Sequence, residues 1–248
     1  MEIPFKGPKL KICRAKHHIA DLERTIIDYR TSRPFVLTIG DIKGRPLFNV
    51  IRQTPPENLP LILGDAIHNA RTALDLLAGD LVEINNNNRE NVRFPFPKKE
   101  DGFKKQMNDS KFKRAAPHAI QMVRDYKPWM GELRALHDLD IADKHSMIIP
   151  LFTFISGNNF SMIFGAETIG ISMTVSSEPV PVDITKLENL LAASLKLVFP
   201  STPINNINLQ EIEVVLKLRQ YVEFVSNLIQ SFEEYYASQG LFDTPSVE

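Results

Sequence analysis

The stretch Pro60-Leu-Ile-Leu-Gly-Asp-Ala-Ile-His-Asn-Ala-Arg-Thr-Ala-Leu-Asp-Leu-Leu-Ala-Gly-Asp-Leu-Val-Glu-Ile84 decides the fold of this chain. Its apolar residues recur at alternating steps of four and three, which is the spacing of one face of an α-helix. These residues are Leu63, Ile67, Ala70, Leu74, Leu77 and Leu81. We therefore predict one long helix whose apolar face packs against the core.

A second face of this predicted helix carries polar groups close enough to hydrogen-bond one another, because they recur every three or four residues. They are Asp65, His68, Thr72, Asp75 and Gly79, with Asn69 and Arg71 on the borders. A helix face in contact with water normally carries Lys and Glu, whereas this one carries His, Asn, Thr and Gly. We expect it to be partly buried.

A second polar group lies in a helix predicted over residues 132–148. There His137, Asp140 and Lys144 share one face with apolar residues. Buried polar groups need partners, and the nearest suitable ones are His68, Arg71 and Asp75 of the first helix. The two helices are expected to pack antiparallel or crossed.

Specific partners are expected within this pair of helices. Opposite charges suggest that Arg71 bonds to Asp140 or Asp143, and that Lys144 bonds to Asp65 or Asp75. The candidate site is therefore a cluster drawn from both helices: Asp65, His68, Asn69, Arg71, Asp75, His137, Asp140, Asp143 and Lys144.

Two sequence blocks resemble those of a widespread family of bacterial proteins. They are Gly64-Asp65-Ala-Ile-His68-Asn69-Ala-Arg71-Thr-Ala-Leu74-Asp75-Leu and Asp143-Lys144-His145. The resemblance spans about residues 9 to 150 and does not extend to the rest of the chain. It implies a bacterial protein, and it brings no established activity and no cofactor.

The cluster has three interpretations. The first is a buried hydrogen-bonded network with a structural or interaction role, which fixes how the two helices pack. The second is a hydrolase or nuclease-like site, in which His68 or His137 moves a proton and Arg71 or Lys144 stabilises negative charge. The chain departs from the HEPN helical ribonucleases, whose motif places a histidine four to six residues after an arginine on one helix.

The third interpretation is a metal site. Asp65 with His68, and His137 with Asp140, each have the spacing that lets one helix offer two ligands. Arg71 and Lys144 oppose a bound cation unless Asp75 and Asp143 neutralise them. The sequence therefore assigns neither a metal nor any other cofactor, and the structural interpretation comes first.

Elsewhere the sequence predicts an α+β fold that is mostly helical. The expected helices cover residues 9–30, 101–107, 117–126, 184–199 and 208–236, the last opening with a capping box at Asn208-Leu-Gln-Glu211. Strands at 35–39 and 47–51 suggest a hairpin, and strands at 151–155, 160–164 and 171–175 suggest a small antiparallel sheet. We expect a helical bundle over 1–150, with 151–248 packed on it as a second unit or as part of one domain.

Composition limits the partners. The 248 residues carry a net charge of −1 and 43% hydrophobic residues, so no global charge attracts nucleic acid. No run of 18 apolar residues predicts a membrane span, and a single cysteine, Cys13, fits a reducing compartment. A cytoplasmic protein is expected. The long C-terminal helix is expected to dock on the bundle, with a homodimer as the alternative.

One local run is basic and contains aromatic residues. It comprises Lys98, Lys99, Lys104, Lys105, Lys111, Lys113 and Arg114, with Phe103 and Phe112 between them. Such a combination can bind single-stranded nucleic acid through phosphate contacts and stacking. Glu100, Asp101 and Asp109 dilute the charge, so a solvated loop is favoured, and nucleic acid stays open as a partner.

Overall fold

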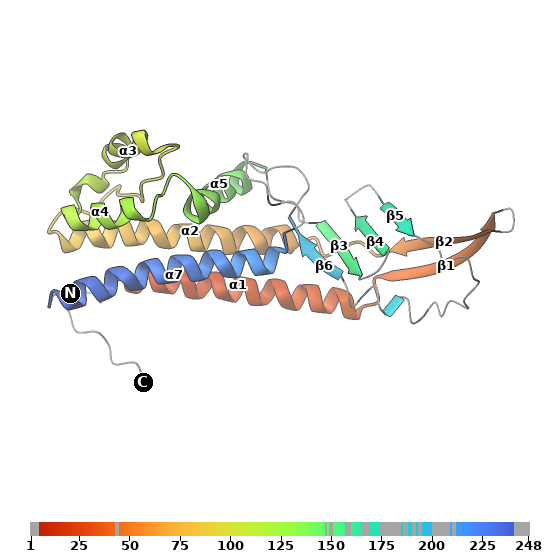
Figure 1. Cartoon of the computed structure of the whole chain (residues 1–248). Coiled ribbons are helices and arrows are strands. Elements are labelled where there is room, and N and C mark those ends of the chain that lie inside the picture. Colours follow the sequence, from red (N-terminus) through yellow and green to blue (C-terminus); the bar gives the residue numbers. More distant parts are fainter. Residues whose placement is uncertain are drawn as a thin grey trace.

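We analysed the chain in a computed structural model. It describes residues 5–42, 45–146, 148, 151–156, 160–164, 169–173, 185, 188–189, 192, 195–199, 209 and 212–240. The described chain is mostly helical, and its helices form a bundle (Figure 1).

Three long helices form the centre of the bundle. They are α1 (Lys6–Thr31), α2 (Leu59–Ile84) and α7 (Val214–Ser238). Lys9 pairs with Glu233 and Arg219 pairs with Glu23, so α1 and α7 run in opposite directions. The three helices share one hydrophobic core, which includes Leu22, Leu74 and Phe232. The C-terminal helix therefore docks on the N-terminal helices, as the sequence predicts.

Helix α2 begins and ends where its sequence changes. Pro60 occupies its first turn, where a missing backbone N–H costs nothing. At the other end Asn86 adopts a positive φ of 55°, the left-handed conformation that asparagine tolerates. The run of asparagines over residues 85–88 therefore follows directly on the end of this helix.

Shorter elements cover the side of α2 that faces away from α1 (Figure 1). In chain order they are η1 (Glu100–Gly102), α3 (Phe103–Asp109), η2 (Phe112–Arg114), α4 (Pro117–Asp125) and α5 (Gly131–Ser146). An extended segment, residues 92–97, leads into this layer, because Pro95 and Pro97 disfavour helix in the residues before them.

Strands lie beyond the end of the bundle at which α1 ends and α2 begins (Figure 1). Between α1 and α2, β1 (Phe35–Ile42) pairs antiparallel with β2 (Arg45–Arg52). A second set, β3 (Leu151–Ser156), β4 (Phe160–Phe164), β5 (Ile169–Met173) and β6 (Leu195–Val198), has the order β5-β4-β3-β6.

Two predictions after residue 180 are wrong. The expected helix over 184–199 does not continue to its end, because residues 195–198 form β6 against β3. Leu195, Lys196 and Leu197 alternate with the period of a strand, which a short apolar run does not distinguish from helix.

The long helix also starts later than predicted. Glu213 bridges Val198 in an extended conformation, so α7 begins at Val214 rather than near residue 208. Asn208 and Glu211 of the expected capping box lie outside the described residues.

Candidate functional site

Helix α5 packs directly on α2, and a glycine permits the close approach. A Cβ placed on Gly64 would lie 2.8 Å from Cγ of Asp143, well inside van der Waals contact. Asp143 is held there because the backbone N–H of Ile148 donates to its Oδ1 at 3.2 Å. Burial at this position raises the pKa of the Asp143 carboxyl above its usual value. The contact between Gly64 and Asp143 joins the two sequence blocks.

The buried part of the interface between α2 and α5 is centred on Arg71. We call Arg71, Asp75 and His137 the inner cluster. The Arg71 side chain is 9% exposed, and its Nη1 lies 2.8 Å from Oδ2 of Asp75 as an ion pair one turn along the helix. Its Nε donates to Nδ1 of His137 at 3.1 Å. One cation thus binds groups on both helices.

The inner cluster also holds the extended segment 92–97. The backbone N–H of Phe94 donates to Oδ1 of Asp75 at 2.8 Å. The Phe96 ring lies 4.3 Å from the Arg71 guanidinium and stacks on the His137 ring at a centroid distance of 4.3 Å. Three chain segments therefore meet at Arg71, which combines ionic and cation–π contacts.

His137 is a neutral hydrogen-bond acceptor in this environment. Burial, then the positive charges of Arg71 and Arg134, lower its pKa to about 3. Its Nδ1 accepts a hydrogen bond from Arg71, so that atom carries no proton. A histidine of this kind is a weak base near neutral pH, and among the two candidates for proton transfer it is the poorer.

The surface-facing part of the interface is built around Asp140. We call His68, Thr72, Asp140 and Lys144 the outer cluster. The Asp140 side chain is 5% exposed, whereas that of His68 is 48% exposed. Nδ1 of His68 lies 3.0 Å from Oδ1 of Asp140, and Nζ of Lys144 donates to Oδ2 at 2.6 Å. The buried Asp140 carboxylate thus binds two basic side chains, His68 and Lys144, that are accessible to solvent.

The second nitrogen of His68 faces a hydroxyl. Its Nε2 lies 3.3 Å from Oγ1 of Thr72, one turn along α2. When Nδ1 donates to the Asp140 carboxylate, Nε2 carries no proton, and its lone pair faces the Thr72 hydroxyl. This chain of carboxylate, imidazole and hydroxyl is the arrangement that orients a general base.

The predicted partners of two residues are wrong. Arg71 bonds to Asp75 and His137 rather than to Asp140 or Asp143. Lys144 bonds to Asp140 rather than to Asp65 or Asp75. In both cases a carboxylate one helical turn away in the same helix lies nearer than one on the neighbouring helix.

Two other predicted members lie apart from both clusters. Asn69 is buried on the side that faces α1, where its Oδ1 accepts a hydrogen bond from Nζ of Lys11 at 3.2 Å. Asp65 is exposed on α2, and its backbone carbonyl accepts from the Asn69 side chain. The cluster drawn from the sequence is therefore divided among an inner part, an outer part and the interface with α1.

The expected geometry of a metal site is not assembled. His68 of the first pair bonds to Asp140 of the second, whereas His137 bonds to Arg71 and Asp65 lies apart, so the four expected ligands do not gather at one point. Across the part of the chain that the structure describes, no group of three or more His, Cys, Asp or Glu residues is placed to hold a metal ion.

Sequence reasoning missed the aromatic and backbone partners. Phe96 and the Phe94 N–H complete the inner cluster, yet neither follows from helical spacing. The signal available was the run Phe94-Pro-Phe-Pro97, whose extended backbone leaves N–H groups without helical partners.

Arg134 and Asp138 of α5 lie beside the inner cluster. They pair with each other one turn apart, and Arg134 also approaches the carbonyls of Phe96 and Pro97 at 3.4 Å. They therefore reinforce the attachment of segment 92–97 from the α5 side.

Comparisons with protein-family models, with curated proteins and with solved structures find no match for this chain. In the described ranges, no helix combines the length and apolar character that crossing a membrane requires.

Proposed function

We propose that the chain is a helical scaffold in which the inner cluster locks α5 and segment 92–97 onto α2. The observation that carries this proposal is the set of partners of Arg71. One buried guanidinium contacts Asp75, His137 and Phe96 at once, on three segments of chain. Networks of this kind specify one arrangement of packed elements.

The proposal also covers the arrangement of the strands, the family relation and the location of the protein. The hairpin of β1 and β2 and the small antiparallel sheet extend the bundle at one end (Figure 1). The family relation is part of it as well: the Gly64–Asp143 contact joins the two sequence blocks, which supports a common α2–α5 unit in bacterial proteins that carry them. A cytoplasmic location follows from the single cysteine.

Hydrogen exchange tests the scaffold directly. The Phe94 N–H is protected by its bond to Asp75, which Arg71 holds in place. In an Arg71→Met variant we expect faster exchange at Phe94 and along α5, with α1 unchanged. Arg24→Met is the matched control, because Arg24 forms an exposed ion pair with Asp21 on α1. Unchanged protection at Phe94 and α5 would overturn the proposal.

A hydrolase is the second candidate, and the outer cluster favours it. Asp140 is buried and orients the exposed His68, which leaves Nε2 able to take a proton from water or from Thr72. Lys144 lies beside the same carboxylate and can stabilise negative charge on a substrate oxygen. His137 has no part in this chemistry, because its low pKa keeps it neutral.

The hydrolase candidate is tested with chromogenic carboxyl and phosphate esters. If the outer cluster is catalytic, His68→Ala reduces turnover by about 100-fold or more, the usual contribution of a general base. Asp140→Asn should shift the pH profile as well as lower the rate. His17→Ala is the control, because His17 is exposed on α1. Equal rates in His68→Ala and His17→Ala would exclude this candidate.

A further inference from the structure

Positive charge is concentrated in one short segment. Residues 93–114 contain eight Lys and Arg and three Asp and Glu, in a chain whose totals are 29 and 30. The segment is therefore strongly basic, while the remainder of the chain is acidic. Such an asymmetry is typical of a surface that meets a polyanion.

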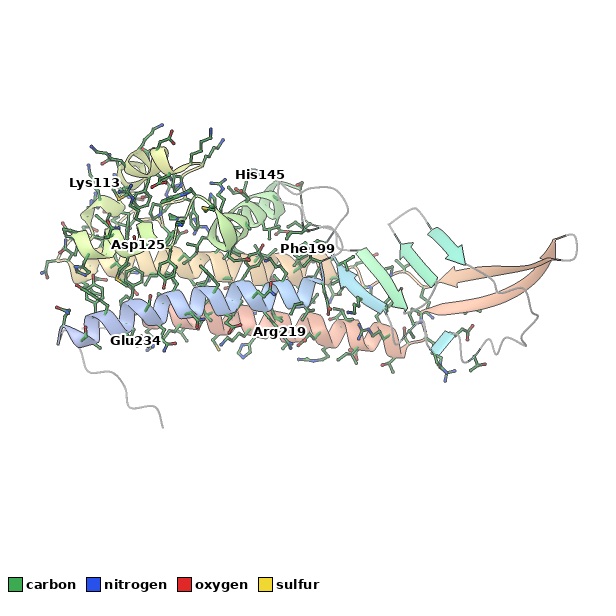
Figure 2. The ribbon with its side chains drawn as sticks, viewed as in Figure 1. Lys113, Asp125, His145, Phe199, Arg219 and Glu234 are labelled. Carbon is green, nitrogen blue, oxygen red and sulfur yellow. The ribbon has the colours of Figure 1, made fainter. Side chains whose placement is uncertain are left out.

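The cations of this segment point into solvent. We call the six lysines the basic face: Lys98, Lys99, Lys104, Lys105, Lys111 and Lys113, all of them exposed. Among the described residues none of the six pairs with a carboxylate, and Glu100 is instead paired with Arg124 at 3.3 Å. Figure 2 shows Lys113 in the layer that covers α2, on the side opposite α1. Their charge is thus available to a partner.

The segment that carries the lysines is anchored rather than loose. Phe103 is 5% exposed and Phe112 is fully buried, and the Phe112 ring contacts that of Phe94. The carbonyl of Arg114 accepts hydrogen bonds from the side chains of Asn85 and Asn87 at the end of α2. The lysines therefore stand on a fixed support.

The burial of the aromatic rings changes which polyanion fits. Single-stranded nucleic acid is bound by bases stacking on exposed rings, and here Phe103 and Phe112 lie in the core. A membrane surface calls for exposed apolar side chains that insert between lipids. The large hydrophobic residues that are exposed in the described chain, such as Leu10, Ile27 and Met130, lie outside this segment.

We infer that the basic face binds the phosphate backbone of double-stranded nucleic acid. Lysine is a compact point charge that contacts phosphate without reading base edges, so binding is independent of sequence. A regular duplex presents phosphates along a rigid track, which suits cations held on a fixed support. The inference is independent of the scaffold and hydrolase proposals.

Fluorescence anisotropy with a labelled duplex of mixed sequence tests the inference. We expect a dissociation constant in the range of roughly 1 to 100 μM near physiological salt, weakening steeply as salt rises, as for other sequence-independent binders. Lys104→Gln/Lys105→Gln and Lys111→Gln/Lys113→Gln should each reduce the slope of log K against log salt by about 2, since each lysine lost removes about one phosphate contact.

Matched variants make the result decisive. Lys6→Gln/Lys16→Gln removes the same charge from exposed positions on α1 and should leave duplex binding unchanged. DNA and RNA duplexes are tested in parallel, beside a single strand and vesicles of anionic lipid. The inference is overturned if neither duplex binds, if the α1 variant weakens binding as much as the basic-face variants, or if single strands or vesicles bind more tightly than both duplexes.

Discussion

The inner and outer clusters use the same residue types in opposite ways. Each contains a histidine, an aspartate and a cation from the interface of α2 and α5. In the inner cluster the cation Arg71 is buried and the aspartate Asp75 is partly exposed, whereas in the outer cluster Asp140 is buried and Lys144 reaches solvent. His137 is itself buried and stays neutral near pH 7, whereas His68 bonds to the buried Asp140 and is about half exposed.

The difference shows that the burial of the histidine and the group that it bonds to decide its role. Burial of the His137 imidazole, and then the charge of the Arg71 guanidinium that donates to it, lower its pKa and produce a fixed acceptor. The buried Asp140 carboxylate accepts from the His68 imidazole, whose second nitrogen faces the Thr72 hydroxyl. The first arrangement suits packing, and the second suits proton transfer.

The largest effect is expected at the centre of the inner cluster. Arg71→Met should lower the free energy of unfolding by about 2 to 3 kcal/mol, because it leaves Asp75 and the His137 ring without their partner. Urea denaturation measures the change. A loss below about 0.5 kcal/mol, the range of surface substitutions, would show that Arg71 contributes no more to stability than an exposed residue does.

A smaller loss is expected where the two helices approach. Gly64→Ala should destabilise the protein by about 1 to 2 kcal/mol, because the added methyl meets the Asp143 carboxylate and overpacks the interface. Gly7→Ala is the control, since its Cβ would lie 3.5 Å from Leu76, an ordinary contact. Equal thermal stability of the two variants would contradict the close packing.

The low pKa of His137 predicts that the stability of the protein depends on pH. In the unfolded chain this histidine binds a proton below its usual pKa of 6.5, whereas in the folded chain it stays neutral down to about 3. Stability should therefore fall as pH drops from 6.5 toward 3, by about 1 to 2 kcal/mol at pH 5.

Denaturation at pH 7.5 and pH 5 tests this dependence in a matched pair. His137→Gln has no titrating group at the position, so it should lose correspondingly less stability over the same interval. If wild type and variant lose the same amount, His137 does not remain neutral in the folded state.

The smallest effect is expected in the outer cluster. Thr72→Val should change the free energy of unfolding by less than about 0.5 kcal/mol, because its hydroxyl and His68 both reach solvent. Differential scanning calorimetry is sensitive enough to compare it with Arg71→Met. A loss as large as that of the inner variant would remove the distinction between the two clusters.

Helical periodicity predicts much of the fold and part of the site. It identifies α2, α5 and their mutual packing, because apolar spacing and polar residues on an otherwise apolar face are local properties. It does not identify which groups bond. Arg71 and Lys144 choose partners within their own helices, and Phe96 enters from a segment with no periodic pattern. The strand β6 was missed because a run of four residues fits either period.

The order of the elements along the chain also affects synthesis. Helix α2 ends at Ile84, and α7, which covers part of the same core, begins only at Val214. At ribosomal speeds of roughly 5 to 20 residues per second, the intervening residues take on the order of ten seconds to emerge. During that interval the apolar faces of α1 and α2 that α7 later covers have no partner from α7, so the shared core is completed only after the last helix emerges.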